Sequence, residues 1–416
     1  MSAPLLARLL ITRAPFYYGW VILACVCLAG FARQGPAVAV LSIFVEPMRR
    51  DLGWSSAAFG GAVSLGGVLA AMLSPSIGRM LDRHGARSVL CLAVLGTGLS
   101  LLAIAHIDSL IFFYVLFCFA RMNWAGPFEL GLYGALNNWF IARRARAASI
   151  ATVAQLAGLV VLPLVAHFAM QGTDWRAGWM AIGLCVLGVG FLPVWLLLVP
   201  RPEDAGLAPE RATGTGTGGE AEAQFTRSEA MRTSAFWMLA LFTVLVFPCQ
   251  AGVSLFLAAH LIERGIDATT AATVVSTAAL ASAAASFGVG WLPRHWPIRY
   301  ALATCSALLA IGALIILGAA SAPRAVIGAS LFGSAIGGML ALLPVVWADY
   351  FGRSSYGAIR GTALSMQVLA QACGPLAAGA LRDAYGDHTR SLMLFAVLAS
   401  MAVLVALTAR KPLPLQ

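Results

Sequence analysis

The sequence predicts an all-α membrane protein whose twelve transmembrane helices form two pseudo-symmetric halves of six. Of the 416 residues, 60% are hydrophobic and only 11% are charged. Runs of about 20 apolar residues recur along the chain, and each is long enough to cross a hydrocarbon core of ~30 Å. A polar stretch in the middle of the chain leaves six such runs on either side, and the two sets resemble each other.

The apolar runs define the expected spans. In chain order they are 17–46, 57–77, 88–106, 110–138, 147–169, 177–199, 234–262, 269–291, 299–319, 324–349, 359–381 and 388–408. The first run exceeds the apolar core of a signal peptide, about 7 to 15 residues, and no small-residue cleavage site follows it, so we expect it to remain as the first helix. All eight cysteines lie inside apolar runs without metal-ligand spacing, which predicts small core residues and neither disulfides nor a metal site.

The distribution of basic residues predicts the orientation of the chain. Twelve crossings leave both termini on one side, which carries eighteen arginines and lysines, Arg360 among them, against seven on the other side. Because cytoplasmic loops are enriched in these residues, both termini are expected on the cytoplasmic side of a cell inner membrane. Basic loops that face anionic lipid account for the net charge of +10, so no nucleic-acid partner is expected.

The chain divides at residues 201–232, which are rich in Gly, Thr, Ala and Glu and cannot bury enough apolar surface to fold alone. We expect a flexible cytoplasmic linker there, between an N-terminal six-helix half, 1–200, and a C-terminal half, 233–416. The halves share a sequence pattern: Pro163 and Pro375 are 212 residues apart, as are Gly78 and Gly290. Such repetition is typical of duplicated transporters.

The loop after the second predicted span reads GRMLDRHGAR and resembles the G-x-x-x-D-R-x-G-x-R signature of the major facilitator superfamily. Its glycines permit a tight turn, and its acid can bind a neighbouring helix end and release it when the halves move. In that family the acid helps to latch the cytoplasmic side, a role that the resemblance assigns to Asp82. The matching residues, predicted to act in gating, are Gly78, Asp82, Arg83, Gly85 and Arg87.

Further segments narrow the resemblance to the monocarboxylate-transporter and oxalate/formate-antiporter branch. They are YYGW from Tyr17, NWFIARRARAAS from Asn137, DYFGRSSYGAIRG from Asp349 and GPLAAGALRDAYG from Gly374. The resemblance implies the major facilitator fold and a secondary transporter that moves a small organic anion by alternating access, as proton symport or anion exchange. No HExxH, GxSxG, P-loop or clustered Cys/His motif appears in the sequence, so neither enzyme activity nor a cofactor is expected.

The chain departs from the well-known animal members at three positions. Those members carry a lysine one residue after the proline of the first helix, where this chain has Ala37, and an Asp and an Arg in the eighth, where Ser282 and Ser286 lie here. The substrate and its coupling to protons therefore stay open. A drug or metabolite efflux antiporter is the alternative, and a non-transporting receptor or a membrane enzyme would be a different class.

Two arginines, Arg33 and Arg121, lie near the middle of apolar runs. A charge at the centre of a membrane helix costs about 2.5–3.5 kcal/mol, so it normally faces a polar cavity or a partner within the bundle. Two interpretations of Arg33 are possible: it binds a substrate carboxylate, or it is a structural partner of Glu129. Gly35 and Pro36 predict a broken turn that exposes backbone groups to a cavity, as in discontinuous transporter helices.

The fourth predicted span carries Arg121, Trp124 and Glu129. Eight helical residues rise ~12 Å, so Arg121 and Glu129 need a bridge to interact. Glu129 is the one acid well inside the first half, and it is either the proton carrier or part of a fixed ion pair. The predicted partners are a small anionic substrate and the lipid bilayer, and the protein is expected to be a monomer. The predicted substrate-binding residues are Arg33, Arg121, Trp124, Gln155 and Gln371.

Overall fold

The computed structural model describes residues 4–13, 16–171, 174–207, 210, 224–291 and 296–412, and helices make up most of them. The helices are α1 (Leu5–Arg13), α2 (Gly19–Arg33), α3 (Val38–Leu52), α4 (Ser56–Ile104), α5 (Leu110–Ala125), α6 (Pro127–Trp139), α7 (Arg144–Met170), α8 (Trp175–Cys185), α9 (Leu192–Leu197), α10 (Arg227–Arg232), α11 (Ser234–Glu263), α12 (Ala268–Val289), α13 (Ile298–Leu317), α14 (Ala322–Phe351), α15 (Tyr356–Tyr385) and α16 (Thr389–Thr408). A π-helix, Val186–Phe191, joins α8 to α9, and a 3₁₀ helix spans Pro202–Ala205.

The helical membrane fold is confirmed, and the described residues contain segments for all twelve predicted crossings. Eleven helical segments of the described chain are long and apolar enough to span a membrane, and one of them, Ala58–Ile104, has 47 residues. At 1.5 Å per residue this segment extends about 70 Å, roughly twice the thickness of a hydrocarbon core. Gly85 divides it, because its φ of 77° and ψ of 162° are not helical. Glycine adopts this positive φ without the steric cost that a Cβ would add.

The chain forms two compact units. The first contains residues 1–222 and 353–365, and the second contains residues 223–352 and 366–416, so α15 begins in the first unit and continues in the second. The segment predicted as a flexible linker includes the 3₁₀ helix and α10, and its residues 208–209 and 211–223 lie outside the described part of the chain. The division into halves at 1–200 and 233–416 remains a prediction.

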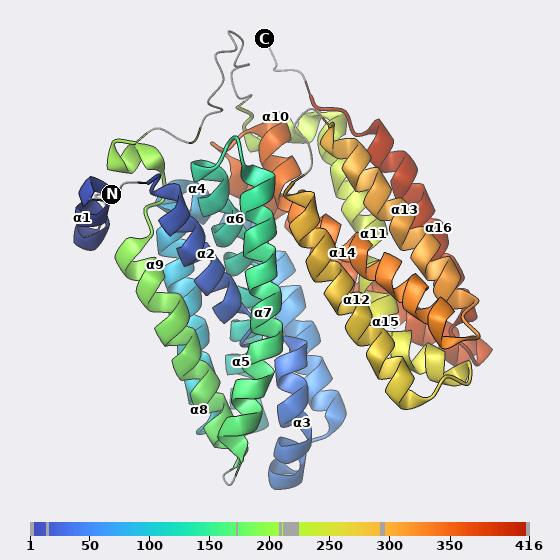
Figure 1. The fold of residues 1–416 in the computed structure, drawn as a ribbon. Helices are drawn as coiled ribbons and strands as arrows, with labels where there is room; N and C mark the ends of the chain where they lie inside the picture. Colours follow the sequence, from blue (N-terminus) through green and yellow to red (C-terminus); the bar gives the residue numbers. More distant parts are fainter. Residues whose placement is uncertain are drawn as a thin grey trace. The chain divides into compact units, whose positions relative to one another are not determined.

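In the first unit, α2 packs along α7, and α4 packs against α5, α6 and α8 (Figure 1). Buried aromatic rings fill the space between these helices. Phe44 of α3 stacks on Trp179 of α8 with 4.0 Å between ring centroids, and both side chains are fully buried. Stacked rings remove a large apolar area from contact with lipid and fix the separation of the two helices.

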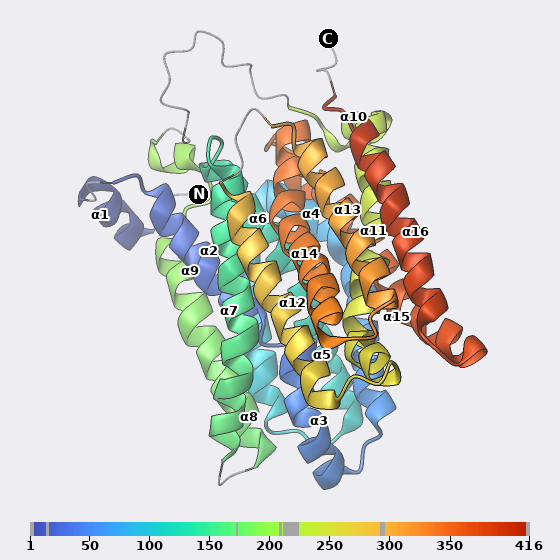
Figure 2. The same ribbon diagram turned by 45° about the vertical axis from the view of Figure 1, so that its right-hand side comes forward.

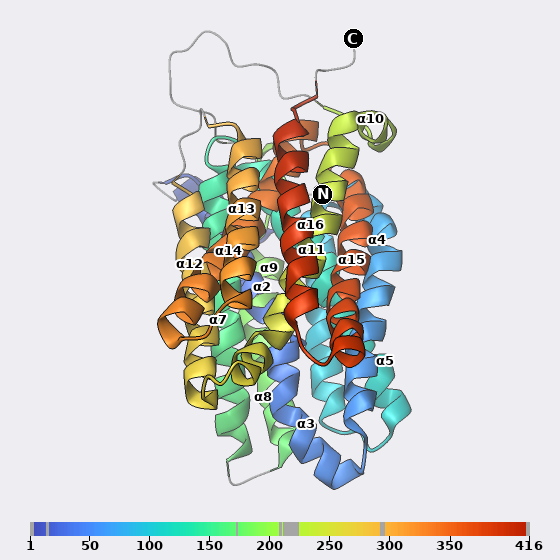
Figure 3. The ribbon, with the colours of Figure 1, turned by 90° about the vertical axis from the view of Figure 1, so that its right-hand side faces the viewer.

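In the second unit, α14 packs against both α12 and α13 (Figure 2), and α16 packs against α11 and α13 (Figure 3). Small residues bring α12 and α14 together. A Cβ on Gly333 or Gly337 would overlap a backbone carbonyl oxygen of α12, that of Ala278 or Ser282. Small residues four apart allow this close backbone contact, which stabilises helix pairs where lipid removes the hydrophobic driving force.

Two spans of the first unit are interrupted near their middle. The break between α2 and α3 falls at residues 34–37, where Gly35 and Pro36 predicted it. The fourth predicted span, 110–138, is present as Leu110–Trp139, but it is not one continuous helix: α5 ends at Ala125 and α6 begins at Pro127. The ring of Pro127 disfavours the helical conformation for the residue before it, and Gly126 has φ −109° and ψ −84°.

Candidate functional site

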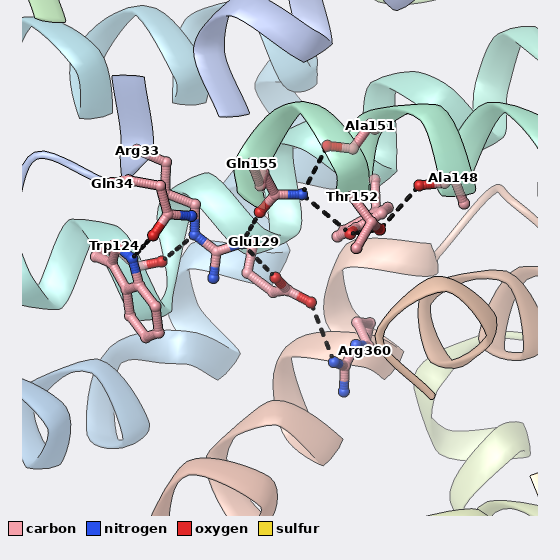
Figure 4. A network of polar contacts seen from close by, with 10 residues as sticks. Arg33, Gln34, Trp124, Glu129, Ala148, Ala151, Thr152, Gln155 and Arg360 are labelled. Atoms are coloured by element: carbon pink, nitrogen blue, oxygen red, sulfur yellow. Dashed lines mark hydrogen bonds and ion pairs between the residues drawn. The ribbon is translucent and has the colours of Figure 1, made fainter. Parts of the chain in front are cut away.

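The side chain of Arg33 is the centre of a polar network inside the first unit (Figure 4). Its NH1 group donates hydrogen bonds to Glu129 Oε2 at 2.8 Å and to Gln155 Oε1 at 2.6 Å. Its Nε donates to the backbone carbonyl of Trp124 at 2.8 Å. Arg33 is 7% exposed, so these contacts replace water around a buried charge. Four residues predicted to lie at the site are thus brought together.

The helix breaks explain why this pair of charges is stable here. Arg33 lies in the last turn of α2 and Glu129 in the first turn of α6. The unsatisfied carbonyl groups at a helix C-terminus favour a cation, and the free N–H groups at an N-terminus favour an anion. Each partner therefore occupies the helix end that suits its charge, and the sequence creates both ends with Gly35-Pro36 and Gly126-Pro127.

A second arginine binds the same carboxylate. Arg360 donates from NH2 to Glu129 Oε1 at 3.4 Å, and Figure 4 shows Glu129 between the two arginines. The sequence placed Arg360 among the basic residues of the cytoplasmic side, and no sequence signal assigned it a role at the site. Arg360 lies in the second turn of α15 and is 1% exposed. A charge count at span ends does not register which face of the helix a residue occupies, and this face packs inward.

Arg121 lies beside the network without a carboxylate partner among the described residues. Its guanidinium stands over the Trp124 ring, 3.9 Å from the centroid, and the guanidinium of Arg33 is 4.7 Å from the same centroid. The Nε and NH1 atoms of Arg121 are buried and have no hydrogen-bond partner. Arg121 and Glu129 do not pair directly, as their spacing predicted. The ring of Trp124 instead contacts the guanidinium groups of both Arg121 and Arg33.

The network carries an excess of positive charge. Three guanidinium groups, those of Arg33, Arg121 and Arg360, accompany the single carboxylate of Glu129. A cation inside a membrane protein is costly unless it has a partner or faces a polar cavity. The excess charge therefore favours an anion beside this cluster.

Two further polar groups, missed by the sequence analysis, orient Gln155. Its Nε2 donates to Tyr133 Oη at 3.2 Å, and Tyr133 in turn is 3.1 Å from Thr152 Oγ1. These contacts direct the amide oxygen of Gln155 toward Arg33. A lone Tyr or Thr within an apolar run has no sequence signal that distinguishes this role. Gln371 lies in the second unit, where it donates to Gln250 Oε1 at 3.0 Å.

The signature loop holds the start of α15 within the first unit. Asp82 accepts hydrogen bonds from the backbone N–H groups of Gly357 at 2.8 Å and Ala358 at 2.7 Å. These groups belong to the first turn of α15 and have no acceptor within the helix, so Asp82 acts as its cap. Elsewhere in the signature, Arg87 donates to the carbonyl of Trp195 at 2.7 Å and Arg83 is exposed.

Backbone contact between α4 and α15 accompanies this cap. A Cβ on Gly78 would overlap the carbonyl oxygen of Gly357, and one on Gly361 would lie 2.5 Å from the carbonyl oxygen of Ser74. Gly357 and Gly361 are four residues apart on one face of α15, the spacing that permits close helix packing in membranes. Arg360, which precedes Gly361, reaches Glu129 from the same two turns.

We expect Asp82→Asn to loosen the first turn of α15 without unfolding the protein. The variant loses the negative charge at the helix N-terminus and keeps one acceptor oxygen instead of two. Hydrogen exchange at the amides of Gly357 and Ala358 should accelerate about tenfold, corresponding to roughly 1.4 kcal/mol. Arg83→Gln, which alters an exposed residue of the same loop, is the matched control. Unchanged exchange in Asp82→Asn would show that the cap does not hold this turn.

The fold and the buried charged network define a class of protein, a polytopic helical membrane transporter. The chain belongs to the Major Facilitator Superfamily, whose family model matches residues 22–359. Members of this superfamily are transporters that bind small molecules within the membrane, and the chain is not an enzyme.

Individual relatives agree with this assignment. Human Monocarboxylate transporter 11 (Homo sapiens) is 27% identical over 400 residues, covering 91% of this chain and 80% of the relative. The crystal structure of the human organic anion transporter MFSD10 (TETRAN) matches with a TM-score of 0.70 and 17% identity, covering 94% of this chain and 98% of that one. The structure of the proton:xylose symporter XylE matches with a TM-score of 0.74 and 14% identity, covering 93% of this chain and 94% of that one. The two structures show the shared fold alone.

Proposed function

We propose that this transporter moves a small organic anion, a carboxylate, and that Arg121 is the principal ligand of its carboxylate group. The observation that carries the proposal is the pair of buried Arg121 nitrogens without an acceptor. A guanidinium offers planar N–H donors that match a carboxylate, and such charge-assisted hydrogen bonds are about twice as strong as neutral ones. The human relative named as a monocarboxylate transporter supports the same substrate class.

Trp124 and Arg33 complete the proposed ligand set. The ring of Trp124 contacts both guanidinium groups and keeps Arg121 in place by a cation–π interaction. Arg33 is occupied by Glu129 and Gln155 and reaches the substrate only when one of these contacts opens. Gln371 is proposed to contribute from the C-terminal half, 233–416, when the halves alternate about a site near the bilayer midplane.

Glu129 is the proposed proton carrier. As a carboxylate it neutralises Arg33 and Arg360, and as a neutral acid it no longer balances either charge. A proton on Glu129 thus raises the positive charge available to an arriving anion, which supports proton symport. Exchange of one anion for another needs no proton movement, and it remains the alternative mode of transport. We further propose that the protein is a monomer in the inner membrane with both termini cytoplasmic.

Arg121→Gln should reduce uptake of the carboxylate substrate by about 10- to 100-fold, because a hydrogen bond to a charged group contributes roughly 1.5–3 kcal/mol. Arg121→Lys should retain part of the uptake, since it keeps the charge and loses the planar set of donors. The measurement is uptake of labelled carboxylates by proteoliposomes containing equal amounts of folded protein. Arg13→Gln, at an exposed position of α1, is the control. Wild-type uptake by Arg121→Gln would refute the ligand role.

Glu129→Gln should abolish the pH dependence of net uptake and preserve anion exchange. Glutamine retains a hydrogen-bond acceptor for Arg33 but neither binds nor releases a proton. Net uptake would be measured under imposed pH gradients, and exchange in vesicles preloaded with the substrate. Glu46→Gln, which alters an exposed acid of α3, is the control. A pH dependence equal to that of wild type in Glu129→Gln would exclude it as the proton carrier.

The charge preference of the site can be tested without knowledge of the substrate. Carboxylates should raise the melting temperature of the purified protein, and the shift should disappear in Arg121→Gln, because a ligand stabilises the state that binds it. Lipophilic cations should give no shift, since the cluster is positive. Stabilisation by such cations alone would instead support the efflux alternative.

A further inference from the structure

An apolar groove of about 450 Å³ opens along the exposed side of α4 and α5 in the first unit. Leucines form much of its walls: Leu92 is 61% exposed and Leu99 is 52% exposed. The groove continues across the two arms of α4, before and after Gly85, and along the end of α5, which lies beside α4 (Figure 3). Its volume falls within the range of about 300–1,000 Å³ that is usual for sites of small ligands.

The wall of this groove includes a buried amide without a partner. Asn123 lines the groove and is 4% exposed, and its Nδ2 has no hydrogen-bond acceptor. Leaving such a donor unpaired is unfavourable, and the surrounding side chains are apolar. A ligand oxygen in the groove would satisfy the amide group. A Cβ on Gly96 would lie 2.8 Å from the Phe119 ring and 3.6 Å from Asn123 Nδ2, so glycine at this position lets α4 pack closely against α5 beside the amide.

One edge of the groove is positively charged. Ser76 lines the groove and accepts a hydrogen bond from Arg79 NH2 at 3.2 Å. Arg79 is exposed and makes no ion pair with a described residue. Arg83, one turn further along α4, is also exposed. Arg79 occupies a variable position of the signature loop, so its charge is not part of the proposed latch.

We propose that the groove binds one anionic phospholipid, with its phosphate at Arg79, a glycerol ester oxygen at Asn123 and an acyl chain along Leu92 and Leu99. Apolar walls suit the chain, and basic residues next to a membrane span attract anionic headgroups. Because the groove joins both arms of α4, the bound lipid supports the helix that carries Asp82. The site is separate from the arginine cluster, so its test does not depend on the identity of the substrate.

The experiment compares phosphatidylglycerol with phosphatidylcholine of the same acyl chains, added to delipidated full-length protein in detergent. Native mass spectrometry counts the lipids retained, and the melting temperature reports their effect on stability. We expect one phosphatidylglycerol to bind at least tenfold more tightly than phosphatidylcholine. Arg79→Gln should remove this preference. Leu92→Trp, which fills the groove, should weaken the binding of both lipids.

Matched controls keep the test specific. Leu184→Trp places the same side chain at an exposed position of α8 outside the groove, and Arg13→Gln removes an exposed charge from α1. Both should bind phosphatidylglycerol as wild type does. Asn123→Leu removes an amide nitrogen that has no hydrogen-bond partner among the described residues, and it should weaken the binding of phosphatidylglycerol about fivefold while the unliganded protein remains folded. Equal binding of the two lipids, or equal losses in the groove variants and their controls, would overturn the proposal.

Discussion

The first unit depends on how it neutralises one carboxylate, that of Glu129, inside an apolar bundle. An unpaired buried carboxylate is strongly unfavourable, and a partner must supply both charge and hydrogen bonds. Arg33 comes from the end of α2, and Arg360 comes from the start of α15. The pairing therefore joins three segments that are far apart in sequence, and removal of Glu129 would leave both arginines without their carboxylate partner. Gln155 and the Trp124 carbonyl position Arg33 for this contact.

Apolar periodicity and turn residues were sufficient to predict the spans and the turn at Gly35-Pro36, and the superfamily was predicted from the resemblance of the loop GRMLDRHGAR to a known signature. They were insufficient at Gly126, because a glycine and a proline within an apolar run are also compatible with a kinked, continuous helix. They also missed Arg360, whose burial depends on the start of α15 packing against α4 within the first unit. Such a contact is long-range, and no local pattern encodes it. The sequence left two roles open for Arg33, a substrate ligand and a structural partner of Glu129. The ion pair between Arg33 and Glu129 supports the second role.

The start of α15 combines two contacts within four residues. Asp82 binds the backbone N–H groups of the first turn, and Arg360 reaches Glu129 from the second. Glycines 357 and 361 make both possible, because they bring the helix backbone against α4. A change in the charge of Glu129 thus acts on the same two turns that the signature acid caps. This arrangement offers a short physical connection between the proposed proton carrier and the proposed latch, through one rigid helix end.

The two membrane arginines differ in what they have available for a ligand. Arg33 is already satisfied by protein acceptors, while buried nitrogens of Arg121 are not. Within the proposed mechanism, an anion therefore binds Arg121 first and competes with Glu129 for Arg33. Protonation of Glu129 would decide that competition in favour of the substrate, because a neutral acid is a weaker acceptor for a guanidinium than a carboxylate. Exchange of anions needs only the contact with Arg121, whereas proton symport needs the contacts with both arginines, so the same three side chains can support either mode.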